Sequence, residues 1–275
     1  MAKVRNMEPG RSTIEAALGQ AVAGGSAQKI RLDDVSKSFQ AAGGSLEALR
    51  DISLDIADGE FVSILGESGC GKTTLLRIVA GLSPPSRGVV VVDGTPVLAP
   101  RRDLGFVFQQ SVLLEWRTVL DNVLLPVEIH GLSRKAYEEE ARSLLRFVGL
   151  EDFETYYPVQ LSGGMQQRVS IVRALILKPA VLLMDEPFGA LDAITREQLN
   201  LELLKIWRHH RNTSVFVTHD IAEAVFLSDR VVLLSPRPGT LQAVYPVDLP
   251  RPRLLDHRYD EDFVRICREI KGAMG

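Results

Sequence analysis

The chain has 275 residues, which is enough for one large domain or two small ones with a substantial hydrophobic core. Its 32 basic residues are balanced by 35 acidic ones, so no overall basic field favours nucleic acid, and we expect no nucleic-acid partner. Two cysteines are too few for a disulfide framework, which is typical of a reducing compartment. No apolar run approaches the roughly 18 residues that a membrane-spanning helix requires.

The first 28 residues are small, polar and rich in glycine, and Glu8, Glu15 and Gln20 interrupt any signal-peptide core. This composition predicts a flexible tail, with a weak targeting role as the alternative. Apolar residues at 30, 32 and 35 then predict an edge strand over 29–39. A glycine-containing loop at 41–45 and a second strand over 48–56 are expected to follow.

The most informative stretch begins at Gly66 and reads Gly-Glu-Ser-Gly-Cys-Gly-Lys-Thr. A short apolar strand over 61–65 leads into it and a helix over 74–80 leaves it, which is the setting of a phosphate-binding loop. Glycines at 66, 69 and 71 allow left-handed backbone angles, so successive N–H groups can face one anion at the positive end of the helix. Lys72 would reach the β- and γ-phosphates, and the Thr73 hydroxyl would bind Mg²⁺. The stretch therefore predicts a nucleotide site.

The rest of the chain alternates between strands and helices. We expect a turn at 83–88, a hairpin at Asp93-Gly94, and a buried strand over 104–108 that ends at Gln109. Two helices are predicted next, one capped by Ser133 and one over 163–177, before strands return at 181–184, 215–217 and 231–234. This order predicts the α/β class, with a mostly parallel sheet, helices on both faces and a helical block inserted at about 111–178.

Two carboxylates follow the apolar strand that begins at Val181. Ligands of α/β sheets bind at the carboxyl ends of strands, so Asp185 is placed to hold Mg²⁺ through its water shell. Glu186 lies on the opposite side of the strand and is placed to polarise an attacking water. The alternative is an ordinary solvated turn.

A third stretch spans the start of the helix at 163–177 and reads Leu161-Ser162-Gly163-Gly164 followed by Met165-Gln166-Gln167-Arg168. It could be an ordinary helix cap, or its backbone N–H groups could form a second anion site. The second interpretation raises the question of how a cradle in a separate subdomain could reach the P-loop of its own chain.

With these motifs in this order, the chain resembles the ATP-binding subunits of ABC transporters over nearly all of 29–250. The resemblance implies a P-loop NTPase (RecA-like) core with an N-terminal antiparallel β subdomain and an inserted α-helical subdomain, followed by a short helical tail at 251–275. The matching motifs are Walker A (66–73), the Q-loop glutamine Gln109, the family signature (161–166), Walker B (181–186), the D-loop (189–192) and the switch histidine His219.

In that family two subunits pair head to tail, and each ATP lies between the P-loop of one subunit and the signature of the other. The resemblance therefore implies ATP and Mg²⁺ as cofactors. It also explains how the signature acts, since it would bind the ATP held by the P-loop of the other subunit. Phe39 would stack on adenine, or else be a core residue of the edge strand; Gln109 would join the Mg²⁺ shell, or else be an ordinary surface residue. The implied site comprises catalytic Glu186, His219 and Gln109; nucleotide-binding Phe39, Gly66, Glu67, Ser68, Gly69, Cys70, Gly71, Lys72, Thr73 and Thr74; signature Leu161, Ser162, Gly163, Gly164 and Gln166; D-loop Asp192; and metal-binding Thr73, Gln109 and Asp185.

Within the family, the stretches 113–119, 185–193 and 248–253 are similar to the nitrate/sulfonate/taurine importer group. Glu115 departs from that group, which commonly has proline there, beside the surface expected to receive the permease. The resemblance implies uptake of a small solute by a homodimer, or by paired ATPase subunits, at the cytoplasmic face of the inner (plasma) membrane. It also implies two integral-membrane permease subunits and a periplasmic or lipid-anchored solute-binding protein.

Three alternatives remain for the function: the ATPase of an exporter, a soluble ABC ATPase acting on nucleic acid or ribosomes, and a nucleotide-binding regulator without hydrolysis. Two alternatives remain for Leu113, Leu114 and Trp116. They could line a groove that receives a short permease helix, or they could be buried in the helical block.

Overall fold

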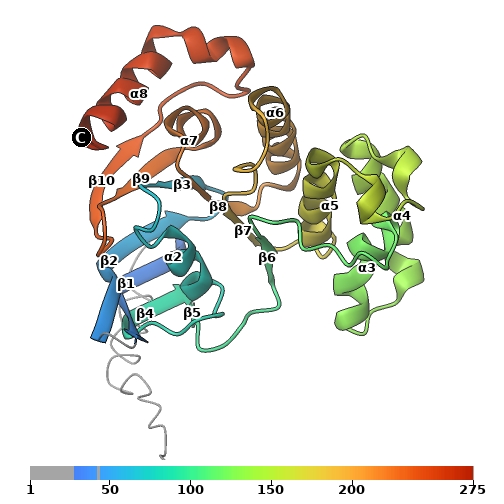
Figure 1. Cartoon of the computed structure of the whole chain (residues 1–275), viewed down its shortest axis with the longest axis horizontal. Coiled ribbons are helices and arrows are strands. Elements are labelled where there is room, and N and C mark those ends of the chain that lie inside the picture. Colours follow the sequence, from blue (N-terminus) through green and yellow to red (C-terminus); the bar gives the residue numbers. More distant parts are fainter. Residues whose placement is uncertain (1–27, 42–43, 275) are drawn as a thin grey trace, which may run out of the picture.

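A six-stranded sheet forms the centre of the computed structural model, which describes residues 28–41 and 44–274 (Figure 1). The tail predicted at 1–28 therefore lies outside the described residues, except for Gln28. Five strands of the sheet are parallel and β10 is antiparallel to its neighbour β9, as the α/β prediction requires. In spatial order the strands are β10 (Leu241–Pro246), β9 (Arg230–Leu234), β3 (Phe61–Leu65), β8 (Thr213–Thr218), β7 (Val181–Asp185) and β6 (Leu104–Val107).

The two faces of this sheet bury alternate residues of each strand, because successive side chains of a strand point in opposite directions. Val62 and Ile64 of β3 pack with helix α2 (Lys72–Val79) and the N-terminal sheet. Phe61 and Leu65 pack on the other face, in the core that contains α5, α6 and α7. Helices therefore cover both faces, and the central strands β3, β7 and β8 are buried throughout. These helices are α5 (Gly163–Leu175), α6 (Ala193–His210) and α7 (Ile221–Leu227).

A second, antiparallel sheet precedes the core, with the order β2 (Gly44–Ala57), β1 (Gln28–Ala41), β4 (Arg87–Val92) and β5 (Thr95–Pro96). The prediction of an edge strand at 29–39 is wrong, since β1 pairs with β2 on one side and β4 on the other. The hairpin prediction is confirmed: Asp93 and Gly94 have φ of 50° and 67° between β4 and β5, as a two-residue hairpin turn requires.

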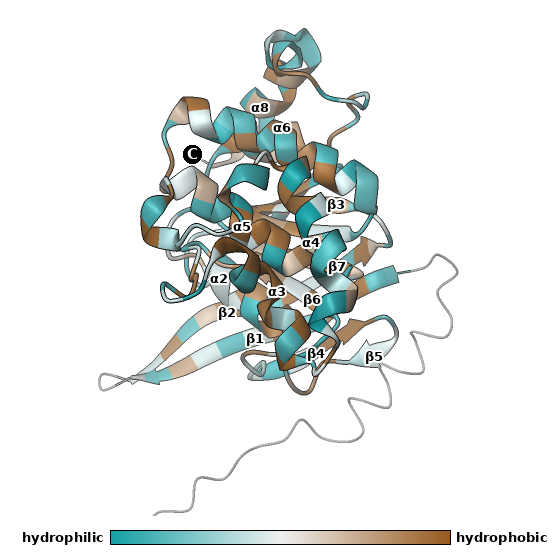
Figure 2. Ribbon diagram, turned by 90° about the vertical axis from the view of Figure 1, so that its right-hand side faces the viewer, coloured by the Kyte–Doolittle hydropathy of each residue, from teal (hydrophilic) through white to brown (hydrophobic). Residues whose placement is uncertain are grey.

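The helical block lies beyond the edge strand β6 and consists of α3 (Val119–Ile129), α4 (Arg134–Phe147) and α5, with short 3₁₀ turns at Glu151–Phe153 and Pro158–Gln160 (Figure 1). Figure 2 shows that the ribbon of α3 is largely hydrophobic, whereas α4 carries many hydrophilic residues. This contrast fits their burial, because six residues of α3 are buried but only three of the longer α4. Thr118 caps α3 by accepting the Asp121 N–H at 3.2 Å.

The chain ends on a 3₁₀ turn (Leu255–Tyr259) and helix α8 (Glu261–Met274). Phe263, Ile266 and Ile270 form the buried stripe of α8, which packs against α7. In the described part of the chain, no helix has the length and apolar character to cross a membrane.

Candidate functional site

The loop at 66–73 joins the carboxyl end of β3 to the start of α2, as the sequence pattern predicts. Gly69 and Gly71 have φ of 79° and 112°, a region that favours glycine. The expectation of a left-handed angle at Gly66 is wrong, because Gly66 is not among the glycines with positive φ. Glycine is required at position 66 for a steric reason instead. A Cβ there would lie 2.8 Å from the Cys70 sulfur and 3.1 Å from the Leu234 carbonyl oxygen.

Lys72 is the first residue of α2 and only 4% exposed. Its Nζ donates to the carbonyl oxygens of Gly66 at 2.8 Å and Glu67 at 3.0 Å, and lies 3.5 Å from a Glu186 carboxylate oxygen. The ammonium is therefore held over the concave side of the loop, beside the start of a helix. Both features favour an anion at this point.

Two oxygen donors meet where β7 ends. The Thr73 hydroxyl donates to the Asp185 carboxylate at 2.8 Å, and Asp185 is buried. Burial raises the pKa of Asp185, while the hydrogen bond from Thr73 opposes the shift. A nearby divalent cation would favour the charged carboxylate, and Mg²⁺ commonly takes one or two protein oxygens together with phosphate and water. The donors Thr73 and Asp185 fit such an ion.

Glu186 and His219 come together although 33 residues separate them. The His219 Nδ1 lies 3.1 Å from a Glu186 carboxylate oxygen. Glu186 has φ of 42°, which is uncommon for a residue with a side chain. The pair can hold and move a proton at the edge of the phosphate loop.

A cavity of about 300 Å³ opens over the loop and brings most of these groups together. Phe39 and Gln109 line it, and Phe39 is 43% exposed; their contacts with a nucleotide stay predictions. Cys70 does not, because its side chain is buried in the core below the loop, so only its backbone can face a phosphate. The cavity is lined by Phe39, Leu46, Ala48, Ser68, Gly69, Gly71, Lys72, Thr73, Thr74, Gln109, Glu186 and Arg237.

Sequence reasoning missed Arg237, which reaches the cavity from the segment between β9 and β10. Its guanidinium donates twice to the Gly69 carbonyl oxygen, at 3.0 and 2.9 Å. Gly239 packs below it, where a Cβ would lie 2.2 Å from the Cys70 carbonyl oxygen. The one sequence feature that could have pointed to Arg237 is the Pro-Arg-Pro-Gly stretch at 236–239, and this pattern is typical of an ordinary turn.

The predicted signature lies at the start of α5, and none of its described residues lines the cavity. Ser162 is exposed and caps α5 by accepting the Met165 N–H at 3.3 Å, and Gly163 is exposed beside it. Leu161 is buried, and Gly164 packs where a Cβ would lie 2.9 Å from a methyl carbon of Thr195.

The side chain of Gln166 is engaged within the chain. It accepts from Ser111 at 3.1 Å and donates to the Pro158 carbonyl oxygen at 2.9 Å. Its contacts therefore link the signature helix to the segment after Gln109.

Asp192, predicted in the D-loop, is the N-cap of α6. Its carboxylate accepts from the Thr195 N–H at 3.0 Å and from the Thr195 hydroxyl at 2.7 Å. These hydrogen bonds lower the pKa of Asp192. The carboxylate therefore stays ionised and holds the first turn of α6 in place.

An apolar groove of about 440 Å³ lies between β6 and the helical block. Phe108, Leu114 and Ile129 are among its lining residues. Neither alternative for the 113–116 stretch holds for all of its residues. Leu113 packs against the core, Leu114 lines the groove, and Trp116 is 74% exposed.

A parallel sheet with a strand–glycine loop–helix unit at its centre, a buried lysine over the loop and carboxylates at the end of β7 defines a P-loop nucleotide-binding protein. Comparison with known proteins narrows this class. The family model described as ABC transporter matches residues 49–189. An uncharacterized ABC transporter ATP-binding protein of Methanocaldococcus jannaschii is 51% identical over 225 residues, which are 82% of this chain and 84% of the relative.

The aliphatic sulfonates import ATP-binding protein SsuB of Bacillus cereus is 41% identical over 241 residues, covering 88% of this chain and 94% of the relative. A solved dimeric structure of a bacterial ABC transporter cassette matches with a TM-score of 0.72 and 37% identity, covering 80% of this chain and 100% of the other. The same cassette, solved in a post-hydrolysis state bound to ADP and phosphate, has a TM-score of 0.70 and 34% identity. The chain belongs to the family of ABC transporter ATP-binding proteins, and it is an ATPase.

Proposed function

We propose that this chain is the ATP-hydrolysing subunit of an importer that takes up a small organic anion of the sulfonate type through separate permease subunits. The similarity to SsuB over most of both chains supports the import direction and the solute class. Two ATPase subunits, two integral-membrane permeases and a solute-binding protein make up the proposed assembly. It lies at the cytoplasmic face of the membrane.

One observation supports a nucleotide site shared between two subunits: within one chain, the P-loop and the signature at the start of α5 lie apart. The P-loop cavity contains no described residue of the signature, whereas Ser162 and Gly163 are exposed at the start of α5. An exposed helix start favours an anion. A head-to-tail dimer would bring this helix start onto the ATP of the partner, and the dimeric state of the solved cassette supports the pairing of two subunits.

Within each site the chain's own residues have distinct tasks. Lys72 binds the phosphates, and Phe39 stacks on the adenine at the rim of the cavity. Thr73 and Asp185, with Gln109 nearby in the lining, would hold Mg²⁺, which neutralises phosphate charge when bound. Glu186 orients and polarises the attacking water, and His219 holds the Glu186 carboxylate in position.

The permease is proposed to insert a short amphipathic helix into the apolar groove beside β6. Trp116 stands exposed at the edge of a turn that is rigidly held. Asn122 is fully buried and fixes this turn: its side chain accepts from Leu114 N–H at 2.7 Å and donates to the carbonyl oxygens of Leu114, Arg117 and Thr118 at 3.0–3.1 Å.

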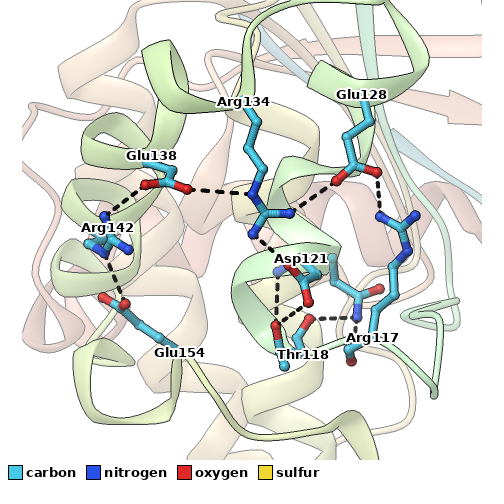
Figure 3. Close-up of polar contacts among 9 residues, drawn as sticks. Arg117, Thr118, Asp121, Glu128, Arg134, Glu138, Arg142 and Glu154 are labelled. Atoms are coloured by element: carbon cyan, nitrogen blue, oxygen red, sulfur yellow. Dashed lines mark hydrogen bonds and ion pairs between the residues drawn. The ribbon is translucent and has the colours of Figure 1, made fainter.

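Ion pairs hold the same turn from the outer side. Arg117 pairs with Glu128 at 2.6 Å, and Arg134 at the start of α4 pairs with both Glu128 and Asp121 of α3 (Figure 3). Exposed pairs stabilise little individually, but a connected network restricts the geometry. The turn is thus a firm support for a docked helix.

The direction of transport gives a direct test. In inside-out vesicles carrying this chain with its permease, and loaded with an alkanesulfonate and the solute-binding protein, added ATP should empty the lumen. An exporter would instead fill the lumen with solute supplied outside. ATP-driven filling, or no ATP-dependent movement of any sulfonate, would overturn the import proposal.

The hydrolytic role is tested by Glu186→Gln. The variant should still bind ATP, because Lys72 and the loop are unchanged, but hydrolysis should fall by roughly 10²–10⁴-fold, the usual contribution of a positioned acid or base. Turnover close to that of the wild type would remove Glu186 from the mechanism.

A further inference from the structure

The first turn of α6 connects the signature with the D-loop. Thr195 lies so close to Gly164 that a Cβ on the glycine would be 2.9 Å from the threonine methyl carbon. Leu191 of the D-loop lies against Gly163, with 3.7 Å between its side chain and the Cβ position. The start of the signature helix therefore packs directly against this turn and the D-loop.

Arg196, in the same turn, connects it to the loop that carries His219. One guanidinium nitrogen donates to the Leu191 carbonyl oxygen at 2.9 Å, and another lies 3.5 Å from a carboxylate oxygen of Asp220. The planar fork of arginine can engage two acceptors at fixed separation, which a lysine ammonium does not reproduce.

Asp220, which follows His219, is itself held by hydrogen bonds to Thr218 and Glu223. Its other carboxylate oxygen accepts the Glu223 N–H at 3.0 Å and so caps α7. Its own N–H donates to the hydroxyl of buried Thr218 at 3.0 Å, and that hydroxyl donates to Glu223 at 2.5 Å. Because His219 lies between Thr218 and Asp220, this network sets where its imidazole stands relative to Glu186.

We propose that Arg196 is a positioning residue that holds the His219 loop in register with the D-loop and signature of the same chain. The inference rests on the roles proposed above for Glu186 and His219. Arg196 does not reach the nucleotide cavity; it acts through Asp220 on the imidazole. As a consequence, the position of the signature (161–166) and the alignment of Glu186 with His219 are linked within one subunit.

The test compares Arg196→Gln and Arg196→Lys, each in the wild type and in a His219→Ala background. We expect Arg196→Gln to lower kcat about tenfold, equivalent to about 1.4 kcal/mol in the activation barrier. ATP affinity and the melting temperature should stay close to those of the wild type. Arg196→Lys should be intermediate, since it keeps the charge without the fork. In the His219→Ala background neither substitution should lower kcat further.

Arg258→Gln is the matched control. Arg258 pairs at 2.9 Å with Glu197, the next residue of α6, and is comparably buried, but it contacts neither the D-loop nor the His219 loop. It should leave kcat unchanged. An equal loss of kcat from Arg196→Gln with and without His219, or an equal loss from Arg258→Gln, would overturn the inference. Full turnover in His219→Ala alone would instead overturn the role proposed for His219, and with it the route through which Arg196 acts.

Discussion

Lys72 donates to two backbone carbonyl oxygens of the phosphate loop and lies near the Glu186 carboxylate, so its charge stabilises the loop in addition to its proposed role toward ATP. Lys72→Ala should lower both ATP affinity and hydrolysis, because a buried charge that faces the phosphates is lost. Equilibrium binding of labelled ATP measures the first effect. Affinity equal to that of the wild type, in a variant with an unchanged circular dichroism spectrum, would contradict the proposed role.

Glu223 gives a prediction for pH dependence. Burial raises the pKa of Glu223, and the neighbouring charge of Asp220 adds to the shift, while the Thr218 hydroxyl and Arg196 oppose it. The native state therefore holds the Glu223 proton more tightly than the unfolded state, so this residue's contribution to stability decreases as pH rises from 4.5 through the raised pKa.

Glu223→Gln should remove this contribution to the slope. Compared with the wild type, the variant should gain stability at pH 8 relative to pH 5. Urea midpoints at several pH values measure the effect, with Glu197→Gln, a change at a half-buried carboxylate of α6 paired with Arg258, as the control. A pH slope identical to that of the wild type would show that Glu223 does not titrate in this range.

The residues of the site could be predicted where a motif fixes their spacing. Thr73, which follows β3, meets Asp185 at the end of β7 across the intervening strand β8, because the carboxyl ends of parallel strands share one edge of the sheet. Arg196 and Arg237 could not be predicted, because each binds a backbone carbonyl through a long side chain, and no local pattern marks such a contact.

At the scale of elements, strands with continuous apolar runs were predicted to within a few residues, while α3 was missed as a helix. Pro126 inside it argues against a helix, yet α3 is stabilised by the Thr118 cap and by burial between α4 and α5. The edge-strand prediction for β1 was wrong because pairing on a second side depends on β4, which follows about 50 residues later.

The turn that Asn122 fixes should couple ATP hydrolysis to transport. Trp116→Ala should leave basal ATPase activity and folding intact, because the side chain is exposed and touches no part of the nucleotide cavity. Transport by vesicles containing the permease should fall, since the docked helix loses a large apolar contact. Tyr259→Ala, which truncates another exposed aromatic residue in the 3₁₀ turn before α8, should leave both activities unchanged. Normal coupling in the Trp116 variant would place the permease elsewhere.

At the scale of the whole molecule, mixed dimers test the proposal that the two anion sites of one chain act together only with a second copy. One subunit carries Ser162→Arg, which places a long side chain over the exposed signature but leaves the P-loop intact. The other carries Lys72→Ala, which leaves the signature intact. Both also carry Glu186→Gln, so that bound ATP is retained. A shared site predicts one intact composite site per heterodimer, whereas a site within one chain predicts none.

The expected result is therefore one tightly held ATP per heterodimer and none in either homodimer of the parent variants. Gel filtration with differently tagged subunits isolates the mixed species, and retained nucleotide is then counted. ADP should hold these dimers far less well, because closure depends on the γ-phosphate being bound from both sides. Heterodimers that retain no ATP, although both parent chains are folded, would exclude the shared site. Each chain would then have to complete its site from residues of its own, and the signature at the start of α5 would have to move into the P-loop cavity.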